Sequence, residues 1–99
     1  MKKNAAIFLK DNIFFVSGDI DFYNVMDIYN QSLLLFKTMK QVIFDFSQVK
    51  SSDSSGLALA IEWIKLSKID HQTIQFKHFP EKLLSIAKVS SLYDVICPL

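Results

Sequence analysis

With 99 residues, of which 51% are hydrophobic, the sequence is long enough for one compact domain with a single core. Eleven lysines, no arginine and ten acidic residues give a net charge of +1, which argues against a chain-wide attraction to nucleic acid or acidic lipid. The single cysteine, Cys97, excludes an intramolecular disulfide. We therefore expect one domain over residues 1–99.

No stretch of the sequence resembles a membrane-spanning helix. The longest apolar runs, such as Leu57 to Ile61, are far shorter than the roughly 20 residues that cross a bilayer. The N-terminal lysines resemble the start of a signal peptide, but Asp11 and Asn12 interrupt the apolar stretch that follows. We therefore expect a cytoplasmic protein for which any role at a membrane comes through a partner.

The first predicted elements form a hairpin. Ala5–Leu9 and Ile13–Val16 are rich in β-branched and aromatic residues, and the turn-forming cluster Lys10–Asn12 separates them. Two antiparallel strands are therefore expected, with Gly18 ending the second one.

An amphipathic helix should follow the hairpin. Asp21 can accept backbone N–H groups as an N-cap, so we expect the helix to begin near Phe22. Apolar residues then recur at intervals of three and four, namely Phe22, Val25, Met26, Tyr29, Leu33 and Phe36. Because such residues share one side of a helix, the sequence predicts that this side packs on a sheet.

The run Val42–Phe46 predicts a central strand because its residues are almost continuously apolar. Asp45 is the exception, and a buried carboxylate without partners would be strongly unfavourable. Its side chain is therefore expected to point toward the following loop or to accept backbone N–H groups. We expect a structural role for it.

A second helix is predicted from about Ser54 to Ile69, with Asp53 near its positive end and lysines near its negative end. Its apolar residues form two stripes, the first with Leu57, Ala60, Ile61 and Ile64, the second with Leu59, Trp63 and Leu66. The first stripe can cover the sheet. The second is either core or, if partly exposed, a docking face for a partner.

The last part of the sequence predicts a turn at Asp70–Gln72, a strand at Thr73–Phe79 and a helix whose first turn contains Pro80. A short strand is possible at Val95–Ile96. The order β-β-α-β-α-β-α predicts an α/β domain with a mixed sheet of four or five strands and helices packed against it.

The sequence contains no recognisable catalytic, nucleotide-binding or metal-binding constellation. Glycine-rich phosphate loops are absent, and His71 and His78 have no ligand-type spacing around them. Ser54 and Ser55 have no adjacent general base and no nucleophile-elbow motif. We expect no enzymatic activity, no cofactor and no metal.

The polar segment Ser51–Leu57 lies between the most apolar strand and the longest helix. It should form a loop that displays hydroxyl groups at a helix N-terminus. Part of its role is to cap the helix, but its small side chains also allow a partner to approach closely. We therefore expect a recognition loop.

Two motifs resemble those of the STAS domain family, named for sulfate transporters and anti-sigma factor antagonists. The segment Asp53–Leu57, which follows Asp45–Ser47 and opens a helix, resembles the family signature. The step Gly18–Asp21 is similar to the family's Gly-Glu-Leu-Asp. The resemblance covers essentially the whole chain and implies the same order of elements.

Within the family, Gly56–Ala60 with Ile64–Lys68, and Lys82–Lys88 with Leu92, are most similar to the MlaB-like branch. This implies a cytoplasmic, non-enzymatic subunit that binds an MlaF-like ATPase subunit of a phospholipid-transporting ABC complex, which maintains outer-membrane lipid asymmetry. The implied partner-binding residues are Asp53, Ser54, Ser55, Gly56, Leu59 and Trp63, with Ser54 at the ATPase contact.

A second branch implies a different function. In the anti-sigma factor antagonists, the hydroxyl at the position of Ser55 is phosphorylated. The alternative is therefore a regulatory switch whose partner is an anti-sigma factor kinase. Phosphate would add a charge of about −1.5 to −2 at this position.

Overall fold

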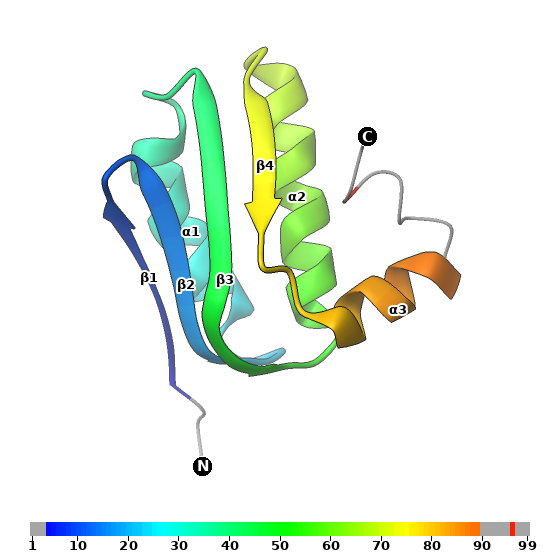
Figure 1. Cartoon of the computed structure of the whole chain (residues 1–99). Helices are drawn as coiled ribbons and strands as arrows, with labels where there is room; N and C mark the ends of the chain where they lie inside the picture. The colour runs from blue at the N-terminus through cyan, green and yellow to red at the C-terminus, as the bar shows by residue number, and fades with distance from the viewer. Residues whose placement is uncertain (1–3, 90–95, 97–99) are drawn as a thin grey trace.

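The computed structural model describes residues 4–89 and residue 96. Four strands form one sheet in the order β1-β2-β3-β4, and helices α1 and α2 lie together behind one of its faces (Figure 1). The elements are β1 (Ala5–Lys10), β2 (Ile13–Ile20), α1 (Val25–Phe36), β3 (Gln41–Ser52), α2 (Ser55–Ile69), β4 (Thr73–Lys77) and α3 (Glu81–Val89). The predicted order and the mixed sheet are confirmed.

Strands β1 and β2 pair antiparallel, whereas β2 with β3 and β3 with β4 pair parallel. The hairpin turn between β1 and β2 uses Asp11 and Asn12, whose φ angles of 52° and 64° lie in the left-handed region. Two such residues match the twist of a two-residue hairpin, and Asn and Asp tolerate this conformation well. The parallel pairs require crossover connections, which α1 and α2 provide.

The prediction that Gly18 ends the second strand is wrong, because β2 continues to Ile20. Gly18 has a φ of 85°, and the register with β3 shifts between Gly18 and Asp19. A Cβ atom at Gly18 would overlap the carbonyl oxygen of Asn4. The glycine therefore allows an irregularity within the strand and does not terminate it.

The first helix also differs from the prediction. It begins at Val25 and not near Phe22, because residues 22–24 form a turn in front of it. Asp21 stabilises this turn, with its Oδ1 accepting the N–H groups of Tyr23 at 2.8 Å and Asn24 at 3.0 Å. The Asp21 carboxylate thus accepts backbone N–H groups as predicted, but it does so in the turn before α1 and not in the first turn of the helix.

The side of α1 that faces the sheet agrees only in part with the predicted one, because Phe36 is buried and Val25 and Tyr29 pack against the core. Its buried residues are Ile28, Ser32 and Phe36, whereas Phe22 and Met26 are exposed. The three-and-four spacing allowed two overlapping stripes on this helix. The structure selects the stripe that contains Ser32, because this serine has a partner in the core.

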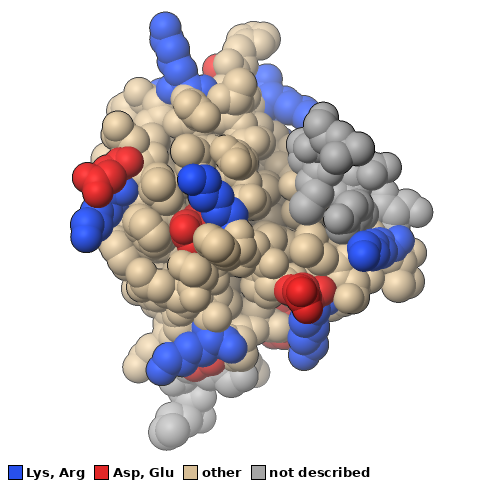
Figure 2. Space-filling model, in the orientation of Figure 1, with Lys and Arg blue, Asp and Glu red and all other residues tan. Residues whose placement is uncertain are grey.

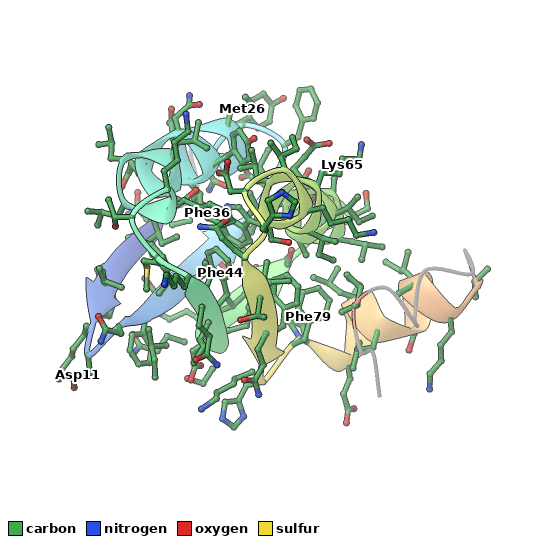
Figure 3. All side chains as sticks on the ribbon, turned by 90° about the horizontal axis from the view of Figure 1, so that it is seen from above. Asp11, Met26, Phe36, Phe44, Lys65 and Phe79 are labelled. Atoms are coloured by element: carbon green, nitrogen blue, oxygen red, sulfur yellow. The ribbon has the colours of Figure 1, made fainter. Side chains whose placement is uncertain are left out.

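That partner is Trp63 of α2, whose Nε1 donates a hydrogen bond to the Ser32 Oγ at 2.9 Å. The Trp63 ring stacks on Phe44 of β3 with centroids 3.7 Å apart, and Phe36 stacks on the same phenylalanine at 6.2 Å. Figure 3 shows Phe36 and Phe44 between the helices and the sheet. The core is thus an aromatic layer joining α1, α2 and β3.

The other elements differ from the prediction mainly at their ends. β3 continues past its predicted end at Phe46 to Ser52, and β4 is shorter than predicted, ending at Lys77. The backbone carbonyl of Pro80 accepts the N–H of Leu83 at 3.0 Å at the start of α3. The possible strand at Val95–Ile96 falls largely outside the described residues, and Ile96 is buried and helical.

Figure 2 shows the sheet face that the helices leave uncovered, where charged side chains are scattered over a largely uncharged surface. Phe8 of β1 and Phe15 of β2 stack on this face with centroids 5.4 Å apart. None of the helices in residues 4–89 is long and apolar enough to cross a membrane.

Candidate partner-binding site

The segment Ser51–Leu57 is not a single loop, as the sequence predicted. Ser51 and Ser52 belong to β3, where they pair with Asp19 and Ile20 of β2. Helix α2 begins at Ser55, so only two residues separate the strand from the helix. The polar character of the serines concealed their strand conformation, because half-exposed positions at the end of a strand accept polar residues.

The strand serines have internal hydrogen-bond partners. The Ser51 hydroxyl donates to Asp19 Oδ1 at 2.5 Å, and the Ser52 hydroxyl donates to the Asp53 carbonyl at 2.8 Å. The Asp53 N–H donates to the Ile20 carbonyl at 3.2 Å. These bonds fix the strand-to-helix junction to the end of β2.

Asp53 also orders the start of α2. Its Oδ1 accepts the Ser55 N–H at 2.8 Å, and its carbonyl accepts the Gly56 N–H at 3.1 Å. Carboxylates at this end of a helix also interact favourably with the helix dipole. The capping role predicted for Asp53–Ser55 therefore belongs to Asp53.

Ser54 and Ser55 are left with available hydroxyl groups. Ser54 precedes the helix but makes no side-chain capping bond, and its side chain is exposed. Ser55 is partly buried, and only its backbone N–H is engaged. Among the described residues, neither hydroxyl has a hydrogen-bond partner. The structure thus presents two adjacent hydroxyls at a helix N-terminus.

Gly56 lies beneath these serines and is buried. A Cβ atom there would overlap the Ser52 hydroxyl and would lie 2.9 Å from Leu83 Cδ1 of α3. Its small size is therefore required by packing inside the domain. The expectation that Gly56 contacts a partner is not supported by its position, which is covered by the protein itself.

The stripe of Leu59, Trp63 and Leu66 is not an exposed docking face. Trp63 is fully buried in the aromatic core, Leu59 is almost fully buried and Leu66 is half-buried. Of the two alternatives for this stripe, core packing is the one that the structure shows. Trp63 is thus placed behind the candidate surface, whereas Leu59 still reaches it.

Leu59 forms the floor of a hollow of about 190 Å³ between α1 and α2, which we call the α1–α2 hollow. Its lining consists of Val25, Met26, Tyr29, Ala58, Leu59 and Glu62. Sequence reasoning missed it because Met26 and Tyr29 were expected to face the sheet. The pairing of α1 with α2 could not be read from either helix alone.

Two exposed aromatic residues lie in the turn that precedes α1. The side chains of Phe22 and Tyr23 are 76% and 80% exposed, and their rings meet edge to face with centroids 5.9 Å apart. Large exposed aromatic groups are unusual on a free surface and are enriched at protein interfaces. The signal in the sequence was the placement of both next to the capping residue Asp21.

Asp45 has the structural role that was expected. It is buried in β3, and its Oδ1 accepts the Ser47 N–H at 2.7 Å. Burial raises the pKa of this carboxyl, but hydrogen bonding to Ser47 and the nearby His78 and Lys77 outweigh it, so the pKa lies below its ordinary value. Asp45 therefore stabilises β3 as an anion.

The described part of the chain contains no group of three His, Cys, Asp or Glu side chains arranged to hold a metal ion. His71 and His78 both lie in exposed turns, with φ angles of 54° and 55°. His71 precedes β4 and His78 follows it, so the two histidines lie at opposite ends of this strand. The candidate site offers hydrogen bonding through the hydroxyls of Ser54 and Ser55, and apolar contact through the side chains between α1 and α2.

Comparisons with known proteins bear on both the fold and the family. A family model described as "Mlab, STAS domain" matches residues 13–97. The fold is similar to that of the anti-sigma factor antagonist SpoIIAA in its unphosphorylated form, with a TM-score of 0.70 and 13% identity, over 94% of this chain and 85% of that one. A search of curated protein sequences finds no significant match.

The fold is also similar to part of the crystal structure of Mglu, with a TM-score of 0.58 and 16% identity. This match covers 79% of the present chain but 20% of Mglu. At these identities, both structural similarities are evidence for the fold alone.

Proposed function

The chain belongs to the MlaB-type STAS domain family, and on that premise we propose that it is a non-enzymatic subunit that binds the ATPase of a phospholipid-transporting ABC complex. It would stabilise or regulate that ATPase from the cytoplasmic side of the inner membrane. The complex would serve to maintain the lipid asymmetry of the outer membrane.

The observation that carries this proposal is the pair of available hydroxyls at Ser54 and Ser55. A buried or capping serine would already have its hydrogen bonds, so hydroxyls without partners are suited to intermolecular ones. The side chains around them are small, which lets a partner backbone approach closely. Ser51, Ser52 and Asp53 hold this end of α2 in place through the bonds given above.

The proposal is tested by Ser54→Arg in cells or extracts that contain the MlaF-type ATPase. A long cationic side chain at this exposed position should block the contact without disturbing the core. We expect the variant to keep its circular dichroism spectrum and its unfolding midpoint but to lose co-purification with the ATPase. Lipid transport should fail with it.

A matched control is Ser85→Arg, because Ser85 is an exposed serine on another helix, α3. This variant should co-purify like the wild type. If Ser54→Arg is folded and co-purifies normally, Ser54 is not at the interface and the proposal fails.

A second candidate function is an anti-sigma factor antagonist that is switched by phosphorylation of Ser55. It is favoured by the available Ser55 hydroxyl at a helix N-terminus, where the helix dipole tolerates the negative charge of a phosphate. A partner matched to a neutral hydroxyl would reject the added charge. Intact mass spectrometry after incubation with an anti-sigma factor kinase decides: without phosphorylation and without binding, this candidate is eliminated.

A further inference from the structure

The size and lining of the α1–α2 hollow suit one side chain of a protein partner. Its volume of about 190 Å³ lies below the range of roughly 300 to 1,000 Å³ that holds small-molecule ligands. Five of its six lining residues are apolar or aromatic, and they come from two helices. Interfaces often place one large anchor residue in such a pocket.

One wall of the hollow is close in the chain to the exposed aromatic pair. Phe22 and Tyr23 lie in the turn directly before α1, and Met26, in the first turn of that helix, is 59% exposed although it also lines the hollow. Figure 3 shows Met26 on the outer side of the helices, away from the sheet. A flexible methionine at the rim can adapt its shape to an incoming side chain. Met26 thus gives the hollow an exposed apolar rim, and the exposed Phe22 and Tyr23 precede it by a few residues.

The charge at the hollow is acidic. Glu62 is the charged residue in its lining, and no lysine lines it. Glu62 pairs with Lys65 at 3.3 Å, but both side chains are more than half exposed, so this pair is weak and easily exchanged. A cation on the partner could therefore take the place of Lys65.

The hollow and the Ser54 hydroxyl lie along the same face of α2. Ser54, Ala58 and Glu62 are four residues apart and follow one face of α2, which places the exposed Ala58 between the serine and the carboxylate. A partner that contacts Ser54 would reach the hollow within two turns of helix, about 11 Å.

From these observations we propose that the α1–α2 hollow receives one large apolar side chain of the partner, carried by a segment with a lysine or arginine next to it. Phe22 and Met26 form the apolar shoulder of this anchor pocket, and Glu62 pairs with the cation. The inference rests on the proposed function only in that it assumes a protein partner at this end of α2.

The test uses synthetic 12-residue helical peptides and the isotope-labelled full chain. Three peptides carry a central Leu, Phe or Trp flanked by lysines. In matched peptides the central residue is Ala, or the lysines are replaced by glutamates. We expect NMR shift changes at the residues that line the hollow for at least one lysine-flanked peptide with an apolar centre, and at least tenfold weaker binding of both matched forms.

Variants then locate the site. Phe22→Ala and Glu62→Lys should each lower the affinity for the peptide that binds the wild type by about tenfold. Leu34→Ala is the matched control, because Leu34 is 81% exposed on α1 but does not line the hollow. It should bind like the wild type.

The inference is overturned if none of the three peptides shifts the lining residues, if the glutamate peptides bind equally well, or if Phe22→Ala binds unchanged. Co-purification of Ser54→Arg with the ATPase is a separate measurement. If that variant no longer co-purifies with the ATPase while the peptides do not bind, the proposed function is supported and the anchor pocket is overturned. If the peptides bind while Ser54→Arg still co-purifies with the ATPase, the anchor pocket is supported and the proposed function is overturned.

Discussion

The two serine pairs on either side of Asp53 carry the same hydroxyl groups but have different roles in the structure. Ser51 and Ser52 end a strand, and their hydroxyls are bound within the protein. Ser54 and Ser55 begin a helix, and their hydroxyls have no partner among the described residues. Backbone position, and not residue type, therefore decides which hydroxyls the fold uses and which remain for a partner.

The largest effect on this junction should come from Gly56→Ala. The added methyl group would overlap the Ser52 hydroxyl and crowd Leu83, so we expect a loss of about 1 to 3 kcal/mol in the free energy of unfolding. Urea denaturation measures it. Adding Ser52→Ala should recover only part of the loss, since the crowding with Leu83 remains. An unchanged midpoint for Gly56→Ala would mean that the strand and helix ends are not tightly packed.

Asp53→Ala should cost about 1 kcal/mol, because the Ser55 N–H loses its carboxylate partner at the start of α2. Thermal unfolding followed by circular dichroism provides the measurement. Asp53→Asn, which keeps an acceptor oxygen, should lose less. A similar loss in Ser54→Ala would contradict the assignment of the cap to Asp53.

Asp45 accepts an N–H two residues ahead in the same way as Asp53, but in the middle of β3. Because its pKa is lower when folded, its stabilisation is present above the ordinary value of 3.8 and is lost as the pH falls through the folded pKa. Asp45→Asn should therefore be less sensitive to acid than the wild type below about pH 4. Urea midpoints across this pH range test it, and parallel curves would refute it.

The smallest effects should separate the two serine pairs directly. Ser51→Ala removes a charge-assisted hydrogen bond and should cost about 1 kcal/mol or less, since the bond is exposed. Ser54→Ala and Ser55→Ala should stay within about 0.5 kcal/mol of the wild type, because no internal bond is lost. If the second pair proved as costly as the first, its hydroxyls would not be available to a partner.

The sequence predicted α2 to within one residue but misplaced the start of α1. Around α2, all the sequence signals indicate the same helix ends, because Asp53 precedes the helix, Lys68 lies in its last turn, and a turn follows. Around α1, Asp21 was correctly taken as an acceptor of N–H groups, but it caps a turn and not the helix. One carboxylate can serve either structure, and only tertiary packing decides between them.

The buried side of α1 could be predicted only in part, for a related reason. Ser32 is polar, so it was left out of the apolar stripe, yet the Trp63 indole gives it a partner across the core. Neither residue predicts the other, because they are 31 positions apart. Once Ser32 faces inward, Met26 turns outward, and the candidate site acquires a wall that sequence periodicity had assigned to the core.

The position of Trp63 also makes the fold observable without labels. It is the only tryptophan in the sequence, and its indole is fully buried, stacked on Phe44 and hydrogen-bonded to Ser32. Its fluorescence therefore reports on the seam where both helices meet the sheet. Trp63 does not line the α1–α2 hollow. Rigid docking there would leave the emission unchanged, whereas a partner that lifted α2 from the sheet would shift it toward longer wavelengths.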